Sequence, residues 1–204
     1  IMIGHNICYT TRVDPTQDIQ PAEDDLIHMA PTGAKFLHQD TRKGLVPLLL
    51  EDLMSQRDEH KAGMKKAKED LDDKALQFHD AMQYAVKILM NSFYGVFASG
   101  FYRFTHRDLG SSITAWARHN IKAIIASLEE EGHSVVYSDT DSIFVRSPVA
   151  ADSISVLKEG ASDEEIENWN NAKQAMVDFG LDIAQRFSKD SAILEFEKGL
   201  SVFF

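Results

Sequence analysis

The chain has a single cysteine among its 204 residues, so no disulfide can form within it. It also lacks an apolar run of roughly 20 residues, the length that a membrane-spanning helix needs. Its eight histidines are scattered without the spacing of zinc ligands, and one cysteine argues against a structural zinc site. These absences disfavour a disulfide-stapled domain, a membrane protein and a zinc module.

Positive charge is scarce: Lys and Arg number 21 against 32 Asp and Glu, and the net charge is −11. A negative excess disfavours contact with a phosphate backbone, so a nucleic-acid role would need a local basic surface. One short stretch supplies such a cluster, consisting of Arg57, Lys61, Lys65, Lys66 and Lys68. Hydrophobic residues make up 44% and charged residues 26%, the balance of an ordinary globular domain.

Two carboxylates stand close together in the stretch Tyr-Ser-Asp-Thr-Asp-Ser, residues 137–142. Apolar strand formers flank it, so we predict a β-hairpin with Asp139 and Asp141 at its tip. Strand alternation would point both side chains the same way, where their charges repel unless a cation lies beside them. Hard divalent cations such as Mg²⁺ choose such oxygen ligands. An ordinary acidic turn is the alternative, because Asp and Ser are common in hairpin loops.

A second motif, in residues 87–95, places polar side chains on one side of a predicted helix. Lys87, Asn91 and Tyr94 share a helical face by their spacing. The opposite face is an apolar stripe of Val86, Leu89, Met90, Phe93 and Phe97. An ammonium, an amide and a phenol would suit a phosphate, a sugar and a base edge. A solvated face with a snorkelling lysine is the alternative.

Arg57 and Lys61 form a third pattern, because residues four apart on a helix are neighbours. They could bind an anion together. The alternative is an exposed basic helix whose cations pair with Asp58 and Glu59, since charge runs are usually solvated faces.

Together these motifs resemble those of the family B DNA polymerases. K-x-x-x-N-S-x-Y-G is similar to that family's fingers motif, and Y-S-D-T-D-S is similar to its palm motif, in matching order and spacing. Arg57 and Lys61 match the R-x-x-x-K of its first fingers helix. The resemblance is closest to archaeal replicative enzymes, covers nearly the whole chain, and extends to residues 1–11, 41–47 and 194–198.

The resemblance implies an α+β fold, with an antiparallel palm sheet, packed helices and a projecting two-helix fingers hairpin. Residues 1–44 and 99–204 would form parts of the palm, and residues 45–98 the fingers. It also implies template-directed DNA synthesis, in which two Mg²⁺ ions assist transfer of a nucleotide from dNTP to a primer 3′-hydroxyl. Asp141 would be the principal metal ligand and Asp139 the supporting one.

The resemblance further implies that Arg57, Lys61, Lys87 and Asn91 line the incoming triphosphate, with Tyr94 against the nascent base pair. Several cations are needed, because the nucleotide carries about four charges and its Mg²⁺ offsets only two. Primer–template DNA and dNTP are the implied partners, with a sliding clamp through other regions and no membrane. The location would be the nucleoid region of the cytoplasm in an archaeon and the nucleus in a eukaryote. The family's first palm motif and thumb are not among these residues, so we expect a fragment that is inactive alone.

Two other functions stay open. One is a non-catalytic, nucleic-acid-binding subunit on a polymerase scaffold, which would usually lose the aspartate pair. The other is an unrelated Mg²⁺-dependent phosphohydrolase, which would not need the motif in residues 87–95. The roles of Glu195, Glu197 and the segment 148–161 are not assigned by the sequence.

Local patterns predict the elements that would carry these residues. We expect the end of a helix in residues 1–12 and a short strand at 35–37. Gly132 should end a helix that begins after a cap at Ser111 or Ser112, and a capping box of Ser162 and Glu165 should open another. The remaining expected elements are helices at 45–70, from about 73 to 98, and 162–189, and a strand at 193–204.

Overall fold

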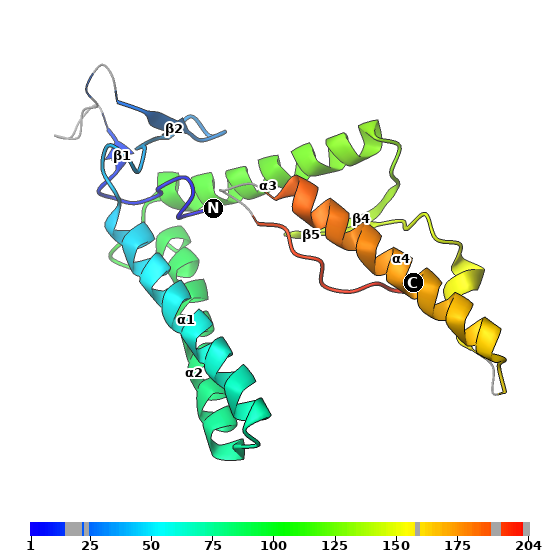
Figure 1. Cartoon of the computed structure of the whole chain (residues 1–204). Helices are drawn as coiled ribbons and strands as arrows, with labels where there is room; N and C mark the ends of the chain where they lie inside the picture. The colour runs from blue at the N-terminus through cyan, green and yellow to red at the C-terminus, as the bar shows by residue number, and fades with distance from the viewer. Residues whose placement is uncertain (15–21, 23–24, 158–159, 189–192, 202–204) are drawn as a thin grey trace. The chain divides into compact units, whose positions relative to one another are not determined.

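The computed structural model describes residues 1–14, 22, 25–157, 160–188 and 193–201 (Figure 1). The fold is α+β, as predicted, with long helices and small antiparallel sheets. The chain divides into two compact units, Ile1–His119 and Asn120–Phe204.

The first unit contains a small antiparallel sheet of β1 (Arg12–Val13), β2 (Ile27–Met29) and β3 (Lys35–Leu37), in the order β1-β3-β2. The strand predicted at 35–37 is confirmed. The helix end predicted in residues 1–12 is wrong, because the segment forms turns before β1. Asn6 has a φ of 51°, a left-handed conformation that an α-helix cannot include.

The core of the first unit gathers around Phe36 of β3, which is fully buried. The other buried members are Ile7, Ala30, Phe97, Leu109 and Trp116. The His5 ring stacks on Trp116, with ring centroids 4.0 Å apart and an interplanar angle of 1°. Burial, helped by nearby His28, lowers the pKa of His5 to about 4, so this imidazole is neutral at physiological pH.

Helices α1 (Leu45–Glu69) and α2 (Asp73–Ala98) form an antiparallel hairpin, as predicted (Figure 1). The tip is a short reversal in which Leu71 adopts a φ of 56°. The amide of Asp72 donates to Ala67 O at 2.9 Å, which satisfies a carbonyl at the end of α1. The Asp72 carboxylate then accepts from the amides of Lys74 and Ala75 and so caps α2.

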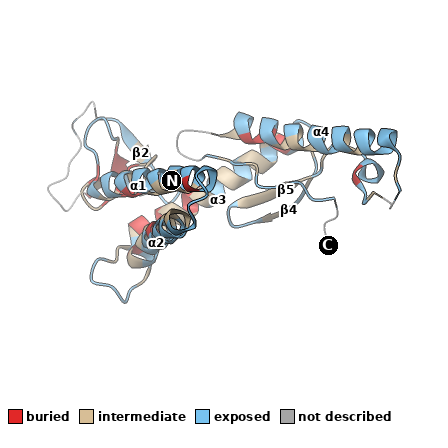
Figure 2. Cartoon of the chain, turned by 60° about the horizontal axis from the view of Figure 1, so that its bottom comes forward, coloured by how far each residue is buried: buried red, intermediate tan, exposed pale blue. Residues whose placement is uncertain are grey.

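The seam between α1 and α2 follows a heptad pattern, because buried and half-buried residues recur alternately every three and four positions. In α1 these residues are Leu50, Leu53, Arg57, His60, Met64 and Ala67, and in α2 they are Leu76, His79, Gln83, Val86, Met90, Phe93 and Phe97. The middle of the seam is polar, and a hydrogen bond of 3.0 Å joins Nδ1 of His60 to Nδ1 of His79. Outer positions of both helices are largely exposed (Figure 2).

Helix α3 (Arg107–Glu130) begins earlier than the predicted cap at Ser111 or Ser112, so that prediction is wrong. His106 Nδ1 accepts from the amide of Asp108 at 3.2 Å and performs the capping role. Ser112 is instead buried inside the helix, where its hydroxyl lies 3.1 Å from that of Thr32. The predicted end is confirmed, since Gly132 has a φ of 85° and follows the last turn.

The second unit contains a two-stranded hairpin of β4 (Val135–Asp139) and β5 (Ser142–Val145), followed by the 3₁₀ turn η1 (Ala151–Ile154) and helix α4 (Asp163–Phe187). The predicted capping box is present: Ser162 Oγ accepts from the Glu165 amide, and the Glu165 carboxylate accepts from the Ser162 amide.

The strand predicted at 193–204 is wrong for residues 193–201, and residues 202–204 lie outside the described chain. The alternation of apolar and acidic residues has another cause. Phe196 lies against Gly180, and Gly199 lies against Met176, so the segment packs along α4 without a strand partner. An alternating segment without a partner edge cannot form a ladder.

Two glycines of the hairpin give a matched stability test. Gly95 has no neighbour within 4 Å of an added Cβ, so Gly95→Ala should raise the free energy of unfolding by about 1 kcal/mol through helix propensity alone. An added Cβ at Gly63 would lie 2.5 Å from the His79 ring, displacing it from His60. The free energy of unfolding should therefore rise less for Gly63→Ala than for Gly95→Ala, or should fall. Urea denaturation followed by circular dichroism compares the two, and equal gains would contradict the described seam.

Candidate catalytic and nucleotide-binding residues

The β4–β5 hairpin places both predicted carboxylates at its tip. Asp139 is the last residue of β4 and pairs with Ser142, so Thr140 and Asp141 form the turn between them. The prediction that strand alternation points both carboxylates the same way is wrong, because Asp141 lies outside both strands. A register shift between Val135 and Tyr137 marks a bulge at the start of β4, at the end of the hairpin away from the tip.

The two carboxylates differ in their surroundings. Thr140 Oγ1 donates to Asp139 Oδ1 at 3.0 Å, and Ser142 Oγ donates to the backbone oxygen of Asp139 at 3.0 Å. Asp141 is exposed, and its carboxylate has no hydrogen-bond or ion-pair partner among the described residues. Asp139 is therefore partly engaged, whereas Asp141 is available to an external ligand.

Thr140 adopts a φ of 51°, which is unusual for a β-branched residue. Left-handed backbone of this kind costs roughly 1–2 kcal/mol per residue. Strain of this size is most often found at functional sites. Here it falls between the two carboxylates.

No group of three or more His, Cys, Asp or Glu side chains is arranged to hold a metal ion in the part of the chain that the structure describes. Asp139 and Asp141 supply hard oxygen donors of the kind that Mg²⁺ prefers, but two carboxylates alone do not complete a site.

In the first unit, the α1–α2 hairpin carries the five predicted nucleotide-binding residues. In heptad notation, with the seam at a and d, Lys61, Lys87 and Tyr94 occupy e positions beside it. Asn91 occupies b, which is adjacent to e around the helix. Because the helices run antiparallel, the e positions of both lie on the same side of the seam. We call these four exposed side chains, Lys61, Lys87, Asn91 and Tyr94, the cationic flank.

Arg57 differs from the other cations because it occupies an a position in the seam. It is half-buried, and its Nε is shielded from solvent without a hydrogen-bond partner. The contact between His60 and His79 fixes the register of the helices. Counting from that contact places Arg57 within about 8 Å of Lys87 along the hairpin axis. Lys61 lies about one turn nearer the tip.

None of Arg57, Lys61 and Lys87 forms an ion pair among the described residues. The alternative of pairing with Asp58 and Glu59 is therefore not observed. The described apolar side of α2 agrees with the prediction, since Val86 and Phe97 are buried. Leu89 is the exception, because it is 49% exposed.

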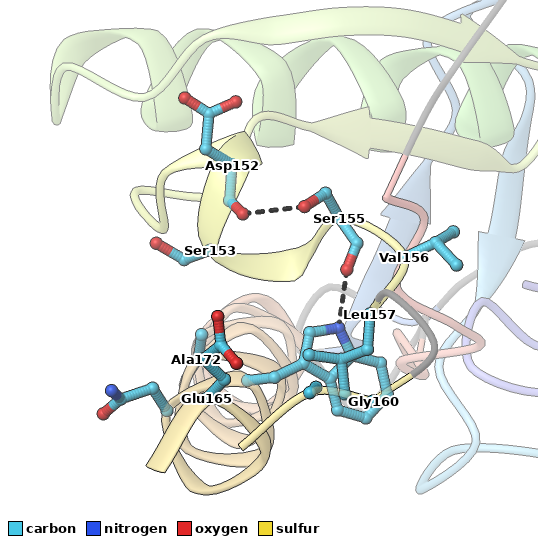
Figure 3. A pocket seen from close by; sticks show the side chains of 11 residues that line it. Asp152, Ser153, Ser155, Val156, Leu157, Gly160, Glu165 and Ala172 are labelled. Atoms are coloured by element: carbon cyan, nitrogen blue, oxygen red, sulfur yellow. Dashed lines mark hydrogen bonds between the residues drawn. The ribbon is translucent and has the colours of Figure 1, made fainter.

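Two cavities among the described residues are lined by side chains other than those of the candidate site. A cavity of about 790 Å³ in the second unit is lined by η1, the segment that follows it and the start of α4 (Figure 3). One wall is closed by the Trp169 indole, whose Nε1 donates to Ser155 O at 2.9 Å. A smaller apolar cavity of about 300 Å³ lies at the base of the α1–α2 hairpin, beside Tyr9 and Phe93.

Comparison with known proteins identifies the family to which the chain belongs. Residues 1–188 match the family model described as DNA polymerase family B, and the chain belongs to this family. The chain is 35% identical over 180 residues to the DNA polymerase delta catalytic subunit of Bos taurus, an alignment that covers 83% of the chain and 16% of that protein.

Archaeal proteins are also similar. The DNA polymerase of Thermococcus gorgonarius is 37% identical over 131 residues, which is 64% of this chain and 16% of that protein. The solved structure of the family B DNA polymerase from Pyrobaculum calidifontis has a TM-score of 0.58 and 25% identity, covering 83% of this chain and 20% of that one. The chain thus spans about a sixth of the length of the curated relatives it matches. Within the described residues, no helix combines the length and apolar character of a membrane span.

Proposed function

We propose that this chain supplies the fingers and part of the palm of a DNA polymerase that adds nucleotides from dNTP to a primer 3′ end. The observation that carries the proposal is the cationic flank, whose lysines have no acidic partner among the described residues. Cations left free of internal ion pairs are suited to a polyanionic ligand. Membership of DNA polymerase family B supports a nucleoside triphosphate as that ligand.

In this proposal Lys61 and Lys87 contact the triphosphate, and Arg57 reaches it from the edge of the seam. An Arg guanidinium can bind two phosphate oxygens at once, whereas a Lys acts as a point charge. The Asn91 amide offers both a donor and acceptors to the sugar or phosphates. The Tyr94 ring, 41% exposed, provides a flat surface for the nascent base pair.

Asp139 and Asp141 fit a divalent cation chemically, because both are exposed carboxylates and Asp141 has no partner among the described residues. Bound Mg²⁺ would supply charge neutralisation and acidify the primer hydroxyl. Asp141 would hold both ions of a two-metal site and Asp139 would support them, oriented by the Thr140 hydroxyl. Further ligands must come from outside the described residues.

We keep the assignment of residues 45–98 to the fingers and of residues 1–44 and 99–204 to the palm. The proposed partners are primer–template DNA, dNTP and, through other regions, a sliding clamp. The proposed location is the nucleus in a eukaryote and the nucleoid region of the cytoplasm in an archaeon.

A non-catalytic polymerase-like subunit is the second candidate, and the retained pair of Asp139 and Asp141 disfavours it. An unrelated phosphohydrolase is excluded by membership of the polymerase family. Nucleotide incorporation by the full-length gene product, measured beside phosphate release, separates a polymerase from a non-catalytic subunit.

We expect Asp141→Asn to abolish nearly all incorporation in the full-length gene product, and Asp139→Asn to cost less. The physical reason is that Asp141 would contact both metal ions, whereas Asp139 lies at the edge of the site. Single-turnover incorporation with saturating primer–template measures both variants. Equal rates for Asp141→Asn and the unmutated enzyme would remove this hairpin from catalysis.

Lys87→Ala should weaken nucleotide use more than primer–template binding. A charge-assisted contact is worth about 1.5–3 kcal/mol, which corresponds to a loss of about ten- to a hundredfold in kcat/KM for dNTP. Lys66→Ala is the matched control, because Lys66 is exposed on α1 but points away from the cationic flank. Steady-state kinetics and a DNA-binding titration decide the matter. A larger loss in the titration would make Lys87 a DNA-backbone contact.

The 204-residue chain alone should show no template-directed incorporation, because two carboxylates do not complete a metal site among its described residues. The measurement is primer extension with Mg²⁺ and all four dNTPs, with the full-length gene product as the positive control. Extension by the isolated chain would show that these residues suffice for catalysis.

A further inference from the structure

The first turn of α1 is capped by side chains from a distant segment. Gly44, the residue before the helix, has no side chain to cap it. The Gly44 amide instead donates to Asn6 Oδ1 at 2.8 Å. The amide of Leu45 donates to Thr10 Oγ1 at 3.4 Å, and that of Val46 to Cys8 Sγ at 3.5 Å.

The next residue of α1, Pro47, has no amide hydrogen. The first intrahelical hydrogen bond joins Leu48 N to Gly44 O at 3.1 Å. Every amide hydrogen from Gly44 to Leu48 therefore has a partner. We call the three capping residues, Asn6, Cys8 and Thr10, the α1 anchor.

Asn6 is the centre of the α1 anchor and is 1% exposed. Its Nδ2 donates to Leu37 O at 2.7 Å and to Arg42 O at 2.8 Å, while its Oδ1 accepts from Gly44. One side chain thus joins the end of β3, the segment before α1 and the first amide of the cap. The left-handed backbone of Asn6 suits this residue type, because asparagine tolerates positive φ.

The contact with α1 is close as well as polar. A Cβ added at Gly44 would lie 2.7 Å from Cys8 Cβ and 3.1 Å from Asn6 Oδ1. Only glycine allows the chain to approach the α1 anchor so closely. The geometry therefore depends on both partners, and it holds the N-terminus of α1 beside the end of β3.

A small change in the direction of α1 has a large effect further along the helix. Arg57 lies about 18 Å along α1 from its first residue, at about 1.5 Å per residue. A tilt of about 10° at the N-terminus would displace Arg57 by about 3 Å over this length. Displacements of about 1 Å can reduce rates a hundredfold where a reacting ligand must be aligned.

We propose that Asn6, supported by Cys8 and Thr10, is a positioning residue for nucleotide binding. It holds the N-terminus of α1 and thereby sets the position of Arg57 and Lys61 relative to the incoming triphosphate. This inference rests on the proposed polymerase function. Asn6 itself is buried and does not touch the nucleotide.

The test uses two substitutions at Asn6 in the full-length gene product. Asn6→Gly removes all three side-chain hydrogen bonds but tolerates the left-handed backbone. Asn6→Asp keeps the shape and the acceptor for Gly44 but loses both donors. The matched control is Ser112→Ala, because Ser112 is also fully buried and hydrogen-bonded in the first unit, to Thr32, without contacting α1.

Both Asn6 variants should raise the KM for dNTP by about tenfold, the effect expected from losing hydrogen bonds that hold α1. The Kd for primer–template should change by less than about twofold, because the contacts of the cationic flank are to the nucleotide. Hydrogen exchange of peptides that span residues 42–48 should quicken by about tenfold. Ser112→Ala should lower the melting temperature without any of these changes.

If an Asn6 variant is active and its KM for dNTP is unchanged, the positioning role is wrong, even if hydrogen exchange quickened. The proposed polymerase function would not be affected by that result. An equal rise in KM for Ser112→Ala would also overturn the positioning role, because general destabilisation would then explain the effect. Absence of incorporation by the unmutated gene product would overturn the proposed function and the positioning role together. The hydrogen-exchange result would still show in that case whether Asn6 holds α1.

Discussion

The packing of α1 against α2 determines which side chains of the hairpin remain available for a ligand. Each helix is about 25 residues long, and most of the stability of a helix in a protein comes from packing of its apolar face. Buried residues near the base, including Leu50, Leu53 and Val86, supply that packing. The seam in turn directs Lys61 and Lys87 to one flank. The nucleotide site proposed for this chain therefore depends on a seam that itself contacts no nucleotide.

The polar residues in the middle of the seam lower the stability of the hairpin but select the register of its two helices. Arg57, His60, His79 and Gln83 occupy positions where aliphatic side chains would pack better. The hydrogen bond between the two histidines can form in only one alignment of the helices, and Gly63 leaves the space that the His79 ring occupies. A polar pair of this kind selects one register among several that an all-leucine seam would allow. That selection is what places Arg57 close to Lys87.

The sequence predicted the parts of the fold that local patterns control. The helices at 45–69 and 73–98 follow from apolar periodicity, and the hairpin at 135–145 follows from strand formers around a turn. The failures at residues 1–12 and 193–201 have a different origin. Whether an alternating segment becomes a strand depends on a partner edge, and whether a turn of chain becomes a helix depends on one residue such as Asn6.

The candidate site also has one part that local sequence patterns predict and another part that they do not. Spacing alone was sufficient to group Lys87, Asn91 and Tyr94 on one exposed face, because helical periodicity is local. The α1 anchor could not be predicted, since Asn6 and Gly44 are 38 positions apart in the sequence. An asparagine followed by Ile7 and Cys8 gives no local sign that its side chain will cap a later helix. The one available clue was Gly44, three residues before Pro47, which marks a helix start without a capping side chain.

The non-glycine residues with a left-handed backbone lie where the chain changes direction. Among the described residues, the non-glycine positions with positive φ are Asn6, Leu71 and Thr140. Asn6 sets the start of α1, Leu71 reverses the chain between α1 and α2, and Thr140 separates the two carboxylates. Each position requires a bend in the chain. The left-handed backbone costs roughly 1–2 kcal/mol at Leu71 and Thr140, whereas asparagine tolerates it at Asn6. The strained residues thus lie at the points that aim the cationic flank and the carboxylates.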